Sequence, residues 1–476
     1  MVEPWHELAS ANSFFNHTHD VISVVPVLSG GPSIYTSSMD VAKQILGAEG
    51  KTQSFKPPVI AVGLLLWGNN LATANGETWK RHRRIVAPAL TSQTYNLVVA
   101  ETIATYRETI DAEDWSVDKD TLVADFNRLP RKLALILIAR CGFGIPMPWG
   151  DPPTSTNYNT FANSLIIVTE TVIPRLLVPS WLYKLPINSI RTIGEAWSSF
   201  VSFMHAFIAS RQVELQDDDE QQGDILSRLV AAMGSDGKLS LDEQEVLGNI
   251  FTLTFTGHET TASTITATLG YLAIYEEEQE KAYEEIIKAV PLSADPTLDD
   301  FQNLPQLLAC FHEAARIYPA GFTIVRELTD DITVTVARPT QKQMALQKGT
   351  LVAIDMIAIR ALKPCQIGWM NYFFPDHNPN VYSEPDVFRP SRWYGVPDHE
   401  ISMFGAGPRA CIGKKFAHLE ALCFLFLFLR DWRVSVPLRD RETRREYEER
   451  VMGKAGMVGS GFGVDPLSLK VTKRSR

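Results

Sequence analysis

Apolar positions recur at three- and four-residue spacing along much of the chain, which is the period of a helix with one buried face. This pattern predicts long helices at five places: 191–215, 240–275, 276–290, 304–318 and 414–430. Alternating and β-branched runs are shorter and predict strands at three places: 33–37, 331–336 and 350–355. The expected fold class is therefore mainly α with small β-sheets.

The helix predicted over 240–275 has an unusual middle. Ser240 and Glu243 have the spacing of a capping box at its start. Further along, "TFTGHETTAS" (254–263) places a glycine and several threonines inside a buried helix, where glycine costs about 1 kcal/mol relative to alanine. Two interpretations stay open. The hydroxyl groups bend the helix by bonding carbonyls one turn back, or the segment forms a groove for a ligand that touches the backbone.

Composition narrows the class of protein. The 476 residues are 45% hydrophobic, enough for a substantial core, and the net charge of -10 argues against a nucleic-acid binder. Five scattered cysteines without a CxxC pair predict neither a disulfide framework nor a zinc site. The longest apolar windows, 57–67 and 421–429, fall short of the roughly 18 residues of a membrane span, and we expect both to be buried.

One cysteine stands in a glycine-rich loop, "FGAGPRACIGKKFA" (404–417), which runs into a predicted helix. The spacing of Gly407 and Gly413, with Lys415 in place of a hydroxyl residue, excludes a phosphate-binding loop. A zinc-protease motif at "HETTA" fails because Ala262 stands where the second histidine belongs. A cysteine nucleophile remains open, since its histidine base can come from elsewhere in the chain.

The other interpretation of Cys411 is a thiolate metal ligand. The start of a helix favours an anion, and Arg409, Lys414 and Lys415 add positive charge beside it. One cysteine supplies one ligand, so the metal must bring most of its coordination with it. Heme does so through four ring nitrogens.

At this point the chain resembles the cytochrome P450 family, in its eukaryotic microsomal, fungal type. The family signature F-x-x-G-x-R-x-C-x-G is matched at every fixed position by Phe404, Gly407, Arg409, Cys411 and Gly413. Four further motifs stand in the family's order: Trp79 and Arg83 as W-x-x-x-R, "TGHETT" (256–261), Glu313 and Arg316 as E-x-x-R, and "PDVFRPSRW" (385–393). A second arginine, Arg392, is expected to complete a buried network with the E-x-x-R pair.

The resemblance implies a single cytochrome P450 domain over 1–476, with heme b between the central long helix and the helix after Cys411. Cys411 would ligate the iron, and Glu259 and Thr260 would deliver protons to dioxygen. Gly257 would let the helix backbone approach the heme; Thr256 replaces the family's usual alanine before it. Further residues implied to hold the cofactor are Trp79, Arg83, Arg326, Phe404, Arg409 and Gly413.

The activity implied is a monooxygenase of secondary metabolism that inserts one oxygen atom of dioxygen into a lipophilic organic substrate. Electrons would come from NADPH through NADPH-cytochrome P450 reductase, which we expect to dock on a basic cluster: Arg81, His82, Arg84, Lys414 and Lys415. Two alternatives stay open. One is a heme-thiolate isomerase or dehydratase, which Glu259 and Thr260 disfavour, and the other is a heme-binding protein without catalysis.

Two segments depart from the family pattern. Residues 1–30 look truncated or atypical, without the expected membrane anchor, so the location implied is the cytosolic face of the endoplasmic reticulum if the start is truncated and the cytoplasm otherwise. Residues 361–375 look like an atypical insertion. The segment 176–186 is a candidate for peripheral membrane contact.

Overall fold

The computed structural model describes most of the chain and divides it into two compact units. Unit 1 holds residues 1–57, 114–131 and 260–476, and unit 2 holds 58–113 and 132–259. Of the four points at which the chain passes from one unit to the other, two lie inside helices, α5 (Arg128–Leu137) and α10 (Glu243–Ile274). The residues described are 20–24, 31, 33–113, 115, 120–150, 157–184, 187–217, 224–233, 237–356, 365–367, 370–372, 382–397, 400, 402–454, 456–458, 461–464 and 466–474.

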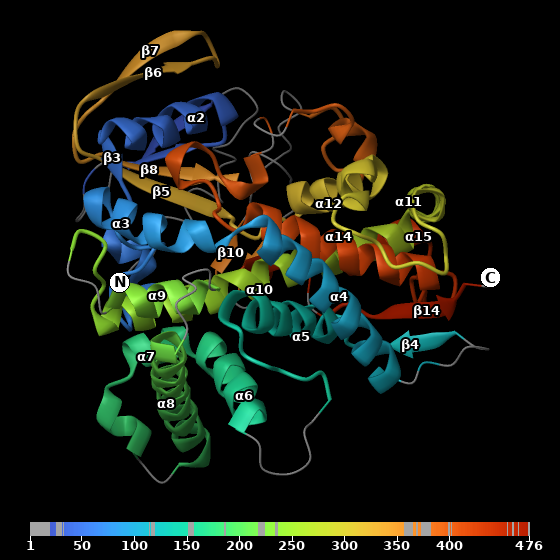
Figure 1. Ribbon diagram of the computed structural model, residues 1–476. Helices are drawn as coiled ribbons and strands as arrows, with labels where there is room; N and C mark the ends of the chain where they lie inside the picture. The colour runs from blue at the N-terminus through green and yellow to red at the C-terminus, as the bar shows by residue number, and fades with distance from the viewer. Residues whose placement is uncertain are drawn as a thin grey trace. The chain divides into compact units, whose positions relative to one another are not determined.

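Unit 1 carries the strands and the helices of the C-terminal half (Figure 1). Its α-helices are α2 (Met39–Ala48), α11 (Glu276–Ala289), α12 (Pro305–Ile317), α14 (Lys414–Asp431) and α15 (Arg444–Arg450). Its strands are β1 (Val21–Val24), β2 (Ser33–Thr36), β3 (Ser54–Phe55), β4 (Thr121–Val123), β5 (Thr323–Leu328), β6 (Ile332–Val336), β7 (Lys342–Leu346), β8 (Leu351–Asp355), β9 (Cys365–Ile367), β10 (Met370–Tyr372), β11 (Trp432–Ser435), β12 (Gly456–Val458), β13 (Gly461–Gly463) and β14 (Leu469–Lys473).

The largest sheet has five strands in the order β1-β2-β8-β5-β3. The pair β2 and β8 is parallel, and the other three pairs are antiparallel. Helix α2 packs its apolar face against this sheet and the β6–β7 hairpin, with Val41, Ile45 and Leu46 in one buried cluster with Val352 and Ile354. This packing fixes the end of α2, where the short 3₁₀ helix η1 (Glu49–Lys51) begins.

Unit 2 is helical in its described part. Besides its portions of α5 and α10 it contains η2 (Pro58–Leu65), α3 (Gly76–Val86), η3 (Ala87–Ala89), α4 (Ser92–Glu113), η4 (Ile138–Gly142), α6 (Asn157–Glu170), α7 (Val172–Leu177), η5 (Ser180–Lys184), α8 (Asn188–Asp217) and α9 (Ile225–Met233). Aromatic side chains form much of its interior, and Trp67 stacks on Trp197 with ring centroids 4.9 Å apart.

The predicted helices are confirmed as α8, α10, α11, α12 and α14, and the predicted strands as β2, β6 and β8. The capping residues predicted for α10 were wrong. Asp242 accepts a hydrogen bond from the Glu245 N–H (2.7 Å), and its own N–H donates to the Glu245 carboxylate (3.2 Å). The capping pair is therefore Asp242 and Glu245, two residues after the predicted pair. Ser240 belongs to the preceding turn, where its N–H donates to the Gly237 carbonyl.

The two long apolar windows differ in how deeply their side chains are buried. Residues 421–429 lie within α14 and are all buried, as expected. The expectation that 57–67 is buried was wrong in part, because Ile60 and Val62 of η2 are exposed. Among the described helices, none is both long and apolar enough to cross a bilayer.

Parts of both atypical segments lie outside the described residues: 1–19, 25–30, 361–364, 368–369 and 373–375. Within the second segment the backbone forms a small antiparallel pair, β9 with β10.

Candidate functional site

The loop that carries Cys411 docks on the end of α2. Gly407, at the start of the 3₁₀ helix η10 (Gly407–Arg409), has a φ of 71°, and a Cβ there would lie 2.8 Å from the Leu46 carbonyl oxygen. Only glycine fits both the backbone conformation and the space. The Cys411 N–H donates to the Phe404 carbonyl (2.8 Å), which closes the loop just before α14.

Cys411 differs from the other described cysteine side chains. Cys141, Cys310 and Cys423 are buried, and burial raises the pKa of the Cys310 and Cys423 thiols. The Cys411 side chain is exposed, one turn before the positively charged side chain of Lys414. This is the setting in which a thiol deprotonates and binds a metal.

A buried carboxylate, Glu313 on α12, organises the segment before the cysteine loop. Arg316 makes two hydrogen bonds to it, from Nε (2.8 Å) and Nη2 (3.0 Å), and both side chains are fully buried. Arg392 Nε (3.0 Å), Trp393 Nε1 (2.9 Å) and the Arg389 N–H (2.9 Å) also donate to Glu313. The expected network of Glu313, Arg316 and Arg392 is confirmed.

Two histidines link this network to the cysteine loop. The Nε2 atoms of His312 and His418 lie 3.2 Å apart, so one ring donates a hydrogen bond to the other. His312 packs edge-on against Trp393 (5.7 Å between centroids), and His418 packs edge-on against Phe404 (4.8 Å). Burial, followed by the charges of His418 and Lys414, lowers the pKa of His312 to about 2, which keeps that ring neutral.

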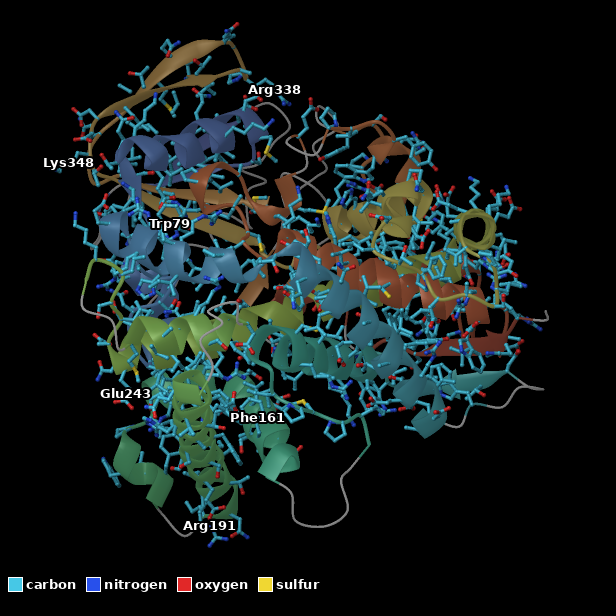
Figure 2. The ribbon with its side chains drawn as sticks, viewed as in Figure 1. Trp79, Phe161, Arg191, Glu243, Arg338 and Lys348 are labelled. Carbon is cyan, nitrogen blue, oxygen red and sulfur yellow. The ribbon has the colours of Figure 1, made fainter. Side chains whose placement is uncertain are left out.

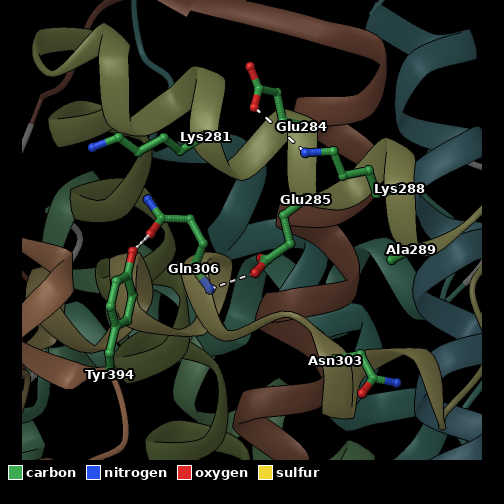
Figure 3. Close-up of a pocket in the computed structure, with 8 residues that line it drawn as sticks. All are labelled: Lys281, Glu284, Glu285, Lys288, Ala289, Asn303, Gln306 and Tyr394. Atoms are coloured by element: carbon green, nitrogen blue, oxygen red, sulfur yellow. Dashed lines mark hydrogen bonds and ion pairs between the residues drawn. The ribbon is translucent and has the colours of Figure 1, made fainter.

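The start of α12 is fixed by a neighbouring helix, beside a surface pocket of about 460 Å³ (Figure 3). The Glu285 carboxylate of α11 accepts hydrogen bonds from the N–H groups of Gln306 (2.8 Å) and Leu307 (2.9 Å), and so caps α12. The Tyr394 hydroxyl donates to the Gln306 side chain, which joins the segment after Trp393 to the same corner. These bonds set the position of Glu313 two turns further along α12.

Arg326 and Arg409 meet at one carboxylate. Glu49 accepts from Arg326 Nε (3.0 Å) and from Arg409 Nε (2.7 Å), and all three side chains are about nine-tenths buried. Lys56 adds a third cation: burial, then the charges of Arg326 and Arg409, lower its pKa to about 8, and Glu49 opposes the shift. At neutral pH this cluster holds three cations and one anion.

Trp79 and Arg83 lie on one face of α3 in unit 2, as expected, with the Arg83 guanidinium 5.6 Å from the centre of the Trp79 ring (Figure 2). The neighbouring residues are not the exposed basic face that was predicted. His82 is fully buried, and Arg81 pairs with Glu245 of α10. The expectation of His82 on a docking surface was therefore wrong, because its side chain is buried against α10, whereas Arg81 is partly exposed and paired with a carboxylate.

Asn249 of α10 holds this corner of unit 2 together. Its Oδ1 accepts from the Leu71 N–H (2.9 Å), which fixes the amide so that Nδ2 donates to His82 Nδ1 (2.7 Å). Neither Asn249 nor Glu245 was found from the sequence, because an asparagine and a glutamate near the start of an amphipathic helix look like ordinary polar positions.

The central helix α10 runs unbroken from Glu243 to Ile274, and its hydroxyl groups do bond carbonyls one turn back. Thr256 donates to the Thr252 carbonyl (2.7 Å) and Thr264 to the Thr260 carbonyl (3.0 Å). Glu259 is buried and Thr260 is partly buried. A Cβ at Gly257 would lie 3.2 Å from the Ile138 side chain, so glycine there also permits close helix packing within unit 2.

A family model described as Cytochrome P450 matches residues 5–456. The chain belongs to the cytochrome P450 family. Its curated relatives include cytochrome P450 monooxygenase 124 of Postia placenta, which is 28% identical over 92% of this chain and 82% of that protein. A cytochrome P450 monooxygenase of the phomenoic acid biosynthesis cluster of Leptosphaeria maculans is 27% identical over 92% of this chain and 81% of that protein.

Solved structures show the same fold. A zebrafish cytochrome P450 with abiraterone matches with a TM-score of 0.73 at 21% identity, over 99% of this chain and 98% of that one. The heme domain of cytochrome P450DA matches with the same TM-score at 18% identity, over 96% and 90%. With its monooxygenase relatives, family membership makes this P450 an oxidoreductase that incorporates molecular oxygen.

The residues present fit the heme that the family implies. Unit 1 brings together an exposed cysteine at a helix start and, through Glu49, the cations Arg326 and Arg409. Guanidinium groups of this kind suit a ring with two carboxylates. Thr260, Phe404 and Gly413 also belong to unit 1, whereas Trp79, Arg83, Gly257 and Glu259 belong to unit 2.

The P450 also buries a carboxyl group that no motif pointed to, Glu420 of α14. Its side chain is fully buried, and neither oxygen has a hydrogen bond of normal geometry within the described chain. Burial raises the pKa of Glu420 well above 4.5, and the Thr261 hydroxyl of α10 opposes this only in part. Burial therefore favours the neutral form of this side chain, since an unpaired buried carboxylate costs several kcal/mol.

This burial predicts a pH-dependent stability. The unfolded chain ionises Glu420 above pH 4.5 while the folded protein keeps the proton, so folding loses about 1.4 kcal/mol per pH unit above that value. Glu420→Gln removes the titration and keeps the shape. In urea unfolding between about pH 5 and 8, the variant should gain stability over the wild type as the pH rises. A difference that does not change with pH would mean that Glu420 is ionised in the folded protein.

Proposed function

We propose that this P450 inserts one oxygen atom of dioxygen into a C–H bond of a lipophilic substrate and reduces the other atom to water. The hydride of NADPH supplies two electrons and one proton, and the electrons pass through a flavoprotein reductase. The second proton of the water comes from solvent. The observation that carries the proposal is Cys411, an exposed thiol on a loop fixed to α2 by Gly407 and tied to the Glu313 network through His312 and His418.

Heme would supply dioxygen binding and electron transfer, and a thiolate ligand would favour cleavage of the O–O bond. Cys411 would provide that ligand. By the family motifs, Arg326, Arg409, Trp79 and Arg83 would hold the ring carboxylates.

Thr260 and Glu259 would supply protons to dioxygen. They are consecutive on an unbroken helix, so the acid and the hydroxyl keep a fixed spacing. Glu259 is buried but retains about a tenth of its surface in contact with solvent, from which it can regain a proton.

Thr260→Ala should uncouple electron use from product formation. We expect product per NADPH to fall roughly 10-fold, with the electrons appearing in hydrogen peroxide, because positioned proton transfer is worth at least that factor. Product, peroxide and NADPH are measured together. Thr268→Ala is the matched control, since Thr268 lies on the same helix, is buried and bonds a carbonyl one turn back. An equal ratio of product to NADPH in the two variants would contradict the assignment of Thr260.

The reaction class is tested with isotopically labelled dioxygen. The purified P450, a flavoprotein reductase, NADPH and a set of lipophilic compounds should give a product with one labelled atom per NADPH consumed. Rearrangement of an organic peroxide without NADPH would instead support the isomerase alternative. Heme uptake with neither reaction would support a non-catalytic protein.

The aromatic interior of unit 2 supports a lipophilic substrate. Trp67, Trp197, Phe200 and Phe251 pack together beside the first half of α10, and Phe255 continues the row toward the "TGHETT" motif. The relative from the phomenoic acid cluster supports a role in secondary metabolism.

Two exposed cations remain candidates for reductase docking: Lys415 at the start of α14 and Arg84 on α3. The double change Lys415→Glu and Arg84→Glu should slow reduction about 10-fold at low salt and weaken its salt dependence, because charge steering acts on association. Lys348→Glu with Arg191→Glu changes the charge equally at other exposed positions and should have little effect (Figure 2). Similar rates for the two double variants would place the docking surface elsewhere.

A peripheral membrane contact on the endoplasmic reticulum is supported by exposed apolar side chains on neighbouring elements of unit 2. Trp181 of η5 is 62% exposed, and Ile60 and Val62 of η2 and Leu176 of α7 are also exposed. Element η5 is joined to α7 by the Tyr183 hydroxyl, which donates to the Pro174 carbonyl (3.0 Å).

Trp181→Ser should lower the affinity for liposomes about 10-fold, because burying a large apolar side chain is worth about 1.5–3 kcal/mol. Leu122→Ser is the control, since Leu122 has a similar exposure but lies on β4 of unit 1. Cosedimentation measures both, and a loss shared equally by the two variants would refute a contact at η5.

A further inference from the structure

The guanidinium group of Arg175, on α7 in unit 2, lies over two buried aromatic rings. Its central carbon is 4.9 Å from the centre of the Tyr183 ring, on η5, and 5.3 Å from the centre of the Trp197 ring, on α8. Both rings are more than nine-tenths buried, and Arg175 itself is only partly exposed. These contacts place the charged end of Arg175 against the interior of unit 2.

Two hydrogen bonds tie these rings to the segment that carries Arg175. The Tyr183 hydroxyl donates to the Pro174 carbonyl (3.0 Å), and the Trp197 Nε1–H donates to the Thr171 hydroxyl oxygen (2.9 Å). One bonded residue directly precedes Arg175, and the other lies four residues before it. The two rings and the cation are therefore held in a fixed arrangement.

The N–H groups of Arg175 have no acceptor within the described part of the chain. A guanidinium group has five N–H donors, and a contact with a ring face stabilises its charge without giving those donors an oxygen. Other arginines of unit 2 are paired: Arg211 with Asp224 (2.7 Å) and Arg140 with Glu108 (3.0 Å). Arg175 is thus available to bind an anion.

The surroundings of this cation are apolar. Leu176 of α7 and Ile60 and Val62 of η2 expose their side chains. Element η2 packs closely on α7, since a Cβ at Gly63 would lie 2.6 Å from the Val172 side chain. One positive charge among apolar side chains matches a ligand with a negative group at one end and an apolar body.

A row of aromatic rings leads from Arg175 to the central helix. Trp197 stacks on Trp67 (4.9 Å between centroids), and Trp67 contacts Phe251 of α10 (4.1 Å). Phe251 stacks on Phe255 (5.5 Å), which directly precedes the "TGHETT" motif. A ligand held at Arg175 by one end can extend its apolar body beside this row toward the motif.

We infer that Arg175 binds the carboxylate of a lipophilic acid, whose apolar body extends beside the row of rings toward α10. The inference rests on the proposed function, since it names the class of the lipophilic substrate. Guanidinium binds a carboxylate through two parallel N–H···O bonds, which a neutral ester does not match. The buried position of the two rings favours a substrate over the head group of an anionic phospholipid as the source of the anion.

The decisive probe compares an acid with its methyl ester, which has the same apolar body and no charge. Equilibrium dialysis of the heme-loaded P450 with dodecanoic acid, hexadecanoic acid and their methyl esters measures binding without turnover. The wild type should bind the acids about 10-fold more tightly than the esters, because charge-assisted hydrogen bonds are stronger than neutral ones.

Two variants of Arg175 and one control test the assignment. Arg175→Met keeps an unbranched apolar side chain and removes the charge, so affinity for the acids should fall about 10-fold and affinity for the esters should not change. Arg175→Lys keeps the charge without the paired N–H groups and should retain part of the preference. Arg191→Met removes an exposed arginine of α8 that pairs with Glu195 (3.4 Å), and should leave the preference unchanged.

Vesicle binding distinguishes the two sources of the anion. The ratio of affinities for phosphatidylcholine vesicles with and without phosphatidylserine should be the same in Arg175→Met as in the wild type. A loss confined to the phosphatidylserine vesicles, with the preference for acids intact, would assign Arg175 to the membrane and overturn the inference.

Equal affinities of the wild type for acids and esters would also overturn the inference, as would a preference that survives in Arg175→Met. Equal losses for acids and esters in that variant would show a structural effect only, and would overturn it too. The labelled-dioxygen assay reports on the proposed function separately. Acids that bind with the expected preference but receive no labelled atom would contradict the oxygenase and leave the binding assignment in place.

Discussion

The buried charge of Glu313 is the interaction on which the rest of the structure depends. A carboxylate taken out of water costs several kcal/mol unless it is paired and fully hydrogen-bonded. Glu313 meets that demand with Arg316 on its own helix and with Arg392, Trp393 and the Arg389 N–H from the following segment. Satisfying one charge therefore determines where the chain lies before the cysteine loop.

The position of the cysteine follows from that constraint and from a second carboxylate. His312 packs against Trp393, His418 packs against Phe404, and the two histidines contact each other. Glu49, near the start of the chain, binds Arg409 of the cysteine loop. The loop thus has two buried anchors and presents one exposed thiol. A single thiolate ligand requires a rigid loop. The other iron ligands belong to the cofactor, so only the loop fixes the position of the cysteine sulfur.

Helical periodicity predicted five helices to within about three residues, because amphipathic patterns are local, but it did not predict the 22-residue helix α4. The family motifs predicted Glu313, Arg316, Arg392 and Cys411 for the same reason. Glu49 was missed because its partners Arg326 and Arg409 are 277 and 360 residues away in the chain, and no local pattern marks a surface-looking acid as buried. His82 was misplaced because charge alone does not reveal that α10 covers its side of α3.

The most direct test of the account is the absorption spectrum of the reduced protein with carbon monoxide. Thiolate-ligated ferrous heme gives a characteristic long-wavelength Soret band, and ligation by a neutral thiol or a histidine gives a shorter-wavelength one. If Cys411 is the thiolate ligand, the wild type shows the long-wavelength band and Cys411→Ala loses it. A heme-loaded wild type without that band, or a Cys411→Ala variant that keeps it, would show that Cys411 does not ligate the iron as a thiolate.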